Sequence, residues 1–277
     1  MKHIASMLLA ISMLLALVVS GYCEAQSLDE EVTVVNNSEC AVIITGIDPD
    51  NMWGYTVEAY LENKSANKTY MFSVTDAAIN GIQTDPFFAT EIAPGKKSNK
   101  EINFSDRDLK SKGVTEYTDI ELSFEVYDSN DWFADSAAEE TIHIYPYGKD
   151  KAAESTRKTQ STDSVIVDNN KVSVIVTDVD EKGFWGYTIN LYLENKTDKE
   201  LMFSAEDVSV NGYMADPYWA KSVGAGKVAY SSMSWSNSTL EKNGIKTVEE
   251  IEMRLEISDS NDWLADPIYN AVVTLKP

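Results

Sequence analysis

Apolar and polar residues alternate along several short segments of this chain, with a period of two. Residues 55–62 alternate in this way, and so do residues 120–126 and 251–257. Alternation over about eight residues is typical of an antiparallel strand that buries one face. The apolar residues expected to point inward are Tyr55, Val57, Ala59, Leu61, Ile120, Leu122, Phe124, Val126, Ile251, Met253, Leu255 and Ile257.

Turn-forming residues separate these segments at short intervals, which indicates many short strands. The turn signals are Asn36-Asn37, Asn80-Gly81, Pro94-Gly95, Asn169-Asn170 and Asn211-Gly212. Asparagine followed by glycine favours the tight turns of β-hairpins. Such closely spaced strands are typical of an immunoglobulin-like sandwich.

One short helical turn is expected in each half of the chain. Ser105 is followed three residues later by Asp108, as in an N-cap with an acid in the first turn, and Gly113 suits the end of the turn. Residues 236–244 form the matching segment in the second half.

The same unit occurs twice, which predicts the domain organisation. Trp53-Gly54-Tyr55-Thr56 returns as Trp185-Gly186-Tyr187-Thr188, and the Leu-Glu-Asn-Lys segment 61–64 returns at 193–196. Each copy is long enough to bury a core of its own. We therefore expect one repeat at residues 31–146, a polar flexible linker at 147–162 and a second repeat at 163–277. The predicted fold class is all-β, as two tandem immunoglobulin-like antiparallel β-sandwiches.

The repeated motifs also carry a family resemblance. The Trp-Gly-Tyr strand, the Glu-Asn-Lys turn, Asp85-Pro86-Phe87-Phe88-Ala89 and Asp128-Ser129-Asn130-Asp131-Trp132 resemble uncharacterised tandem repeat domains of secreted or surface-tethered Gram-positive bacterial proteins. The resemblance covers both repeats. It implies an immunoglobulin-like extracellular module and no catalytic residue.

The first residues predict the destination of the protein. A lysine precedes an apolar run, and small residues follow it, so residues 1–25 are expected to be a signal peptide. Secretion or display at the cell surface follows, and Cys23 leaves lipoprotein anchoring as an alternative. No transmembrane span is expected in the mature chain. There Cys40 is the remaining cysteine, and it is expected to be buried because its counterpart is Val172.

The formal net charge of −22 opposes binding to nucleic acid, which needs clustered lysine and arginine. Catalysis is also poorly supported, because His143 is the remaining histidine after the signal peptide and its counterpart is Thr274. We therefore expect no catalytic residues and no enzymatic activity.

Two acidic loops are the candidate metal sites. Each follows a predicted strand and offers four side chains with oxygen donors, as Ca²⁺ prefers. The alternative interpretation is a pair of Asx-turns that satisfy local backbone amides. The residues concerned are Asp128, Asn130, Asp131 and Asp135, and Asp259, Asn261, Asp262 and Asp266.

Aromatic residues supply the other candidate site. Adjacent aromatics on a strand face opposite sides, so one of each pair at 87–88 and 218–219 is expected to point outward. We take Phe88 and Trp219 as the outward pair and as a platform for a sugar or peptide. Trp53 and Trp185, which precede alternating strands, are expected to be buried.

These features favour a non-catalytic extracellular interaction or spacer protein that presents loops and edge strands to a protein or glycan partner. One alternative is a calcium-stabilised cell-surface module. The other is a carbohydrate-active enzyme or an accessory carbohydrate-binding protein.

Overall fold

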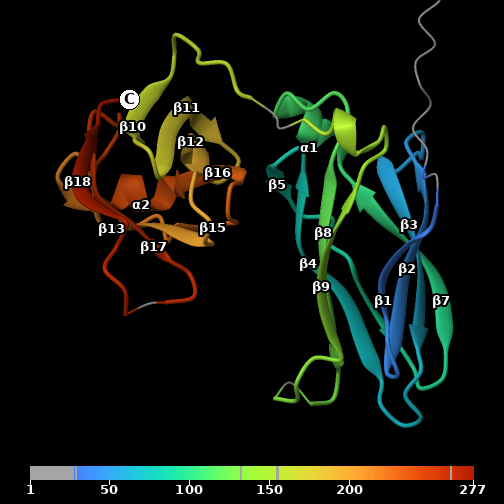
Figure 1. The fold of residues 1–277 in the computed structure, drawn as a ribbon. Coiled ribbons are helices and arrows are strands. Elements are labelled where there is room, and N and C mark those ends of the chain that lie inside the picture. Colours follow the sequence, from blue (N-terminus) through green and yellow to red (C-terminus); the bar gives the residue numbers. More distant parts are fainter. Residues whose placement is uncertain (1–27, 29, 132, 154–155, 263) are drawn as a thin grey trace, which may run out of the picture.

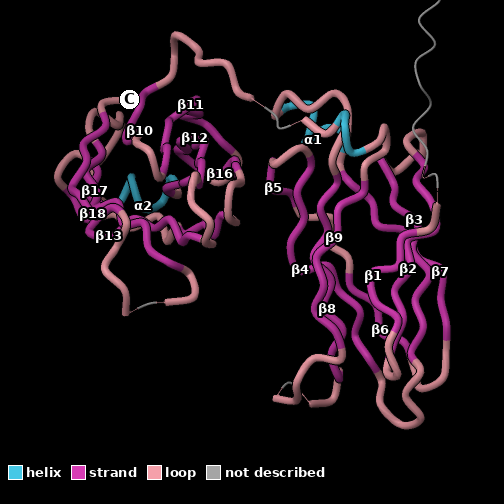
Figure 2. The backbone as a smooth tube through the Cα atoms, viewed as in Figure 1, coloured by secondary structure: helices cyan, strands magenta, loops and turns pink. Residues whose placement is uncertain are grey.

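The computed structural model describes residues 28, 30–131, 133–153, 156–262 and 264–277 and shows an all-β protein made of antiparallel sheets (Figures 1 and 2). The predicted fold class is confirmed, and the arrangement is consistent with an immunoglobulin-like β-sandwich. The expected signal peptide, with Cys23, lies outside the described residues. Within the described part of the chain, no helix is long and apolar enough to cross a membrane.

The first repeat forms two facing sheets. One has the order β1-β2-β3-β7, and in the other β5, β4, β8 and β9 follow one another while β6 also pairs with β4. The elements are β1 (Val32–Asn36), β2 (Cys40–Asp48), β3 (Tyr55–Asn63), β4 (Tyr70–Ile79), β5 (Ile82–Thr84), β6 (Ala89–Ile92), β7 (Lys97–Phe104), α1 (Asp106–Ser111), β8 (Ile120–Asp128) and β9 (Ala138–Ile144).

The second repeat follows the same plan. Its strands pair in the orders β10-β11-β12-β16 and β14-β13-β17-β18, with β15 also on β13. A short 3-10 helix, η1 (Lys149–Lys151), precedes it. The elements are β10 (Ser164–Asp168), β11 (Val172–Gly183), β12 (Gly186–Asn195), β13 (Leu201–Val210), β14 (Tyr213–Met214), β15 (Ala220–Val223), β16 (Val228–Trp235), α2 (Asn237–Lys242), β17 (Ile251–Asp259) and β18 (Tyr269–Leu275).

Alternation along the strands produces two separate hydrophobic cores, one in each repeat. All the apolar residues that the alternation assigned to the inside are buried. Cys40 belongs to the first core as a free thiol, as its exchange with Val172 indicated. Burial raises the pKa of its thiol to about 11, so the group stays protonated at neutral pH.

The two predicted helical turns are confirmed. In α1 the Ser105 hydroxyl accepts a hydrogen bond from the Asp108 amide at 3.3 Å, and in α2 the Ser236 hydroxyl accepts one from the Thr239 amide at 3.2 Å. These bonds satisfy backbone donors that the first turn of a helix leaves free.

A buried asparagine links the two sheets of the first repeat. The side-chain amide of Asn63, at the end of β3, donates to the Lys68 carbonyl at 2.8 Å. It also donates to the Ile92 carbonyl, in the other sheet, at 2.7 Å. Its Oδ1 accepts from the Ser65 amide at 2.9 Å. Asn195 makes the same kind of links in the second repeat.

The repeats also meet edge to edge. β16 pairs with β5 in parallel, and the Val228 amide donates to the Gly81 carbonyl at 2.9 Å. Next to this bond, the Lys227 Nζ lies 2.7 Å from Asp76 and 2.8 Å from Glu121. Burial opposes the charge of Lys227, but these two carboxylates outweigh it and raise its pKa. Figure 1 shows β5 and β16 facing each other.

The connector between the repeats makes contacts with both of them. The Ala153 amide donates to the Thr118 hydroxyl at 3.1 Å. The Arg157 guanidinium forms two hydrogen bonds with Asp163, at 2.7 and 2.6 Å, and lies over the Tyr192 ring at 5.6 Å.

We predict that residues 31–146 and 163–277 each fold alone, because each carries its own core. Circular dichroism and thermal melting of the separate halves should show cooperative unfolding. Limited proteolysis of the whole chain should cut first within 147–162. An unfolded half, or first cleavage inside a repeat, would contradict this division.

Asn63→Ala should lower the free energy of unfolding of the first repeat by about 2–4 kcal/mol, since it leaves buried backbone groups without partners. Asn170→Ala, at an exposed turn position, is the control and should change it by no more than about 0.5 kcal/mol. Denaturant unfolding measures both. An Asn63 variant as stable as the control would show that water replaces the amide.

Candidate functional site

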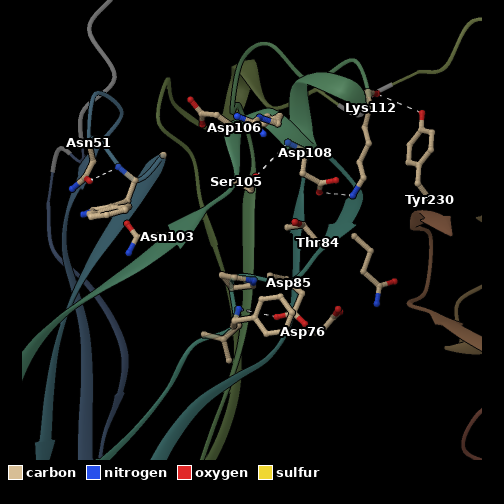
Figure 3. A pocket seen from close by; sticks show the side chains of 18 of the residues that line it. Asn51, Asp76, Thr84, Asp85, Asn103, Ser105, Asp106, Asp108, Lys112 and Tyr230 are labelled. Carbon is tan, nitrogen blue, oxygen red and sulfur yellow. Dashed lines mark hydrogen bonds and ion pairs between the residues drawn. The ribbon is translucent and has the colours of Figure 1, made fainter. Parts of the chain in front are cut away.

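A groove with a volume of about 970 Å³ opens at the end of the first repeat that carries α1 (Figure 3). Its walls are the turn between β2 and β3, the bend of β4, the loop after β5 and the start of α1. Its lining combines exposed aromatic rings with amide and carboxylate side chains, the kind of mixture that orients a ligand in a binding cleft. The lining residues include Asn51, Trp53, Asp76, Gln83, Asp85, Phe87, Asn103, Asp106, Asp108, Lys112, Lys221 and Tyr230.

Trp53 lines this groove with 71% of its surface exposed, so the expectation that it is buried was wrong. The next residue explains the error. Gly54 has a φ of +112°, and an added Cβ there would collide with the carbonyl of Phe104. This glycine turns the chain, so the alternation begins at Tyr55 and leaves Trp53 outside. The Trp53 amide donates to the Asn51 side chain at 3.0 Å.

Phe87 is the second exposed ring, at 90%, whereas Phe88 is half-buried and packs against the core. The outward residue is therefore Phe87 and not Phe88. Phe87 has a φ of +50°, a left-handed conformation that costs a bulky residue roughly 1–3 kcal/mol. The Asp85 carboxylate accepts from the Phe87 amide at 2.8 Å and holds this turn.

The second repeat presents rings at the same two places. Trp185 is 74% exposed and Tyr218 is 92% exposed, again with a φ of +50°. Trp185 was therefore also wrongly expected to be buried. Trp219, expected to face outward, is 7% exposed, and its Nε1 donates to the Ser231 hydroxyl at 2.9 Å. Trp185, Tyr218 and Trp219 lie in loops and not in strands. The alternation of a strand therefore predicts the wrong side chains to face solvent.

Carboxylates that line this groove already have hydrogen-bond or ion-pair partners within the protein. Asp108 pairs with Lys112 at 2.7 Å, and the Tyr117 hydroxyl donates to Asp106 at 2.7 Å. Partial burial opposes ionisation of Asp106, but the hydrogen bonds from Tyr117 and from the Tyr55 amide outweigh it and lower its pKa. These groups are thus arranged as fixed hydrogen-bond acceptors.

The second repeat supplies one side of the groove. Tyr230 and Lys221 line it, and the Tyr230 hydroxyl lies 3.5 Å from the Lys112 carbonyl (Figure 3). Burial raises the pKa of Tyr230, so it stays a neutral donor. The contact between β5 and β16 therefore helps to build this site.

The first acidic loop contains two Asx-turns. The Asp128 Oδ1 accepts from the Asn130 amide at 3.0 Å, and the Asp131 Oδ1 accepts from the Phe133 amide at 3.2 Å. Asp135 is exposed. Trp132 and Trp263 lie outside the described residues.

The second loop repeats these turns. Asp259 accepts from the Asn261 amide at 2.9 Å, and Asp262 accepts from the Leu264 amide at 3.3 Å, while Asp266 is exposed. A hydrogen bond from Lys199, at 2.6 Å, lowers the pKa of Asp259. In the part of the chain that the structure describes, no group of three or more acidic, histidine or cysteine side chains is arranged to hold a metal ion.

Comparison with known proteins adds no family and no function to this description. No protein-family model and no curated protein matches the chain. Among solved structures, it is similar to a chain of the CsuC–CsuE complex of a chaperone and a tip adhesion subunit, from the archaic chaperone-usher Csu pili of Acinetobacter baumannii. The identity is 11%, the match covers 79% of this chain and 90% of that chain, and the TM-score is 0.22. A TM-score this low carries no argument about fold or function.

We predict that calcium leaves the melting temperature unchanged relative to a chelator. Asp131→Asn should also be nearly neutral, because asparagine can accept the same amide hydrogen bond. Thermal melts of the wild type and the variant, each with millimolar calcium or EDTA, test both statements. A melting temperature that rises with calcium concentration in the wild type and not in the variant would instead establish a calcium site.

Proposed function

We propose that this chain is a non-catalytic extracellular binding protein whose groove in the first repeat holds a neutral oligosaccharide. The observation that carries this proposal is the exposed pair Trp53 and Phe87 at one groove, with Phe87 kept in a strained backbone conformation. Strain at an exposed aromatic residue is costly, and such strain gathers at binding sites.

The groove chemistry favours a sugar over other partners. A sugar ring has apolar C–H faces that lie flat on aromatic rings and hydroxyl edges that hydrogen-bond to amides and carboxylates. Asn51, Gln83 and Asn103 line the groove as amides, and Asp85 lines it as an acceptor. The strongly acidic chain disfavours an anionic ligand.

A binding role also accounts for the carboxylates better than catalysis does. Asp76 pairs with Lys227, Asp85 holds the Phe87 turn and Asp108 pairs with Lys112. A general acid or base has to exchange its proton during a reaction, whereas these groups are held as fixed acceptors. The proposal also includes secretion of the protein or its display at a cell surface. It includes a relation to the Gram-positive repeat domains that the sequence motifs resemble.

Trp53→Ala and Phe87→Ala should each weaken oligosaccharide binding at least about tenfold, a loss of ~1.4 kcal/mol. Trp185→Ala is the matched control, because the second repeat keeps the ring but has Met214 and Ser234 where the groove has Gln83 and Asn103. A panel of neutral cell-wall and plant oligosaccharides, followed by titration calorimetry on the binders, measures the effect.

Binding that survives both groove substitutions would place the ligand elsewhere. A panel with no binder would overturn the proposal. Turnover of any oligosaccharide would show that the protein is an enzyme.

A further inference from the structure

The contact between the two repeats uses two different surfaces. The second repeat offers the start of β16, where the Val228 amide donates to Gly81 at 2.9 Å. It also offers Lys227, which lies between Asp76 and Glu121 at 2.7 and 2.8 Å. The first repeat supplies the receiving edge. Since the repeats share one plan, each surface has a counterpart that this contact does not use.

The counterpart of the donor surface lies on the first repeat. The backbone amide of Asn63 donates to the Lys96 carbonyl at 2.9 Å, and the backbone amide of Asn195 donates to the Lys227 carbonyl at 2.9 Å. Lys96 is therefore the equivalent of Lys227. Lys97, the first residue of β7, then corresponds to the first residue of β16. Both lysines are exposed, and β7 is the last strand of its sheet.

The counterpart of the receiving surface lies on the second repeat. Gly81, Asp76 and Glu121 accept the internal contact, and each has an exposed equivalent in the second repeat. In the same order, the equivalents are Gly212, Asp207 and Glu252. Beside them β14, which is Tyr213 and Met214, ends its sheet with both side chains more than half exposed. Exposed apolar edge strands are ready to pair with another chain.

We propose that the chain binds a second copy of itself head to tail, with β7 and Lys96 of one copy on β14 and Glu252 of the next. The internal contact between the repeats is the model for the geometry. Lys97 would donate its amide to the Gly212 carbonyl of the second copy, and Lys96 would pair with Glu252. Because the two surfaces differ, the contact is heterologous, and an assembly that does not close into a ring keeps one free surface at each end.

Three differences make this contact weaker than the internal one. Arg254 already pairs with Asp207 at 3.2 Å, so Glu252 is the main partner for Lys96. The side chain of Gln83, which accepts from the Gly224 amide at 3.3 Å, is replaced by Met214. The internal contact also benefits from its tether, which raises the effective concentration of the second repeat. Assembly should therefore be reversible and require high protein concentration.

Sedimentation velocity of the whole protein over a concentration series tests the proposal. The mean mass should rise continuously with concentration and fall when salt is added. Lys96→Glu and Glu252→Lys should each raise the concentration needed for assembly at least about tenfold, because each places like charges together. Lys171→Glu, the same charge change at an exposed turn, should behave as wild type.

The double variant Lys96→Glu with Glu252→Lys provides the decisive result, since it exchanges the two charges and should restore assembly. Recovery in this variant would also show that the single variants had folded. A wild type that stays monomeric, or a double variant that assembles no better than the single ones, would overturn the proposal. The oligosaccharide proposal does not depend on the outcome.

Discussion

The buried asparagine at the end of β3, and its counterpart on β12, is the interaction on which the rest of each sandwich depends. No disulfide joins the described sheets, and the cores consist of apolar side chains that impose little direction. Asn63 and Asn195 supply directional bonds from one sheet to the other at 2.7–2.9 Å. A buried amide left without partners is costly, so these bonds specify one register between the sheets.

Once the sheets are fixed, the turns at their ends can hold side chains in conformations that they would otherwise avoid. Gly54 lets the chain pass close to the Phe104 carbonyl and leaves Trp53 in solvent. Asp85 holds Phe87 at a positive φ. Both rings therefore stand on a rigid frame, which lowers the entropy lost when a ligand binds. The repeated Trp-Gly and Asp-Pro motifs are explained by these turns and not by the core.

The strands and the two helical turns could be predicted because each depends on local pattern, and the buried thiol could be predicted because Cys40 has Val172 as its counterpart in the second repeat. The exposed rings could not be predicted from alternation, because Trp53 and Phe87 lie just outside a strand, where one residue with positive φ reverses the side that faces solvent. Gly54 after Trp53 was the signal available in the sequence. The pairing of β5 with β16 had no local signal at all, since it joins edges far apart in the chain.

Duplication itself explains why the two candidate surfaces arise together. A repeat that docks edge to edge on its neighbour must carry both a donor edge and a receiving edge, and a tandem pair uses one of each. Lys96 and Glu252 keep the charges of Lys227 and Glu121. In the first repeat the internal contact also completes the groove, because Tyr230 of the second repeat lines it. Binding site and assembly surface would thus arise from the same edge-to-edge contact.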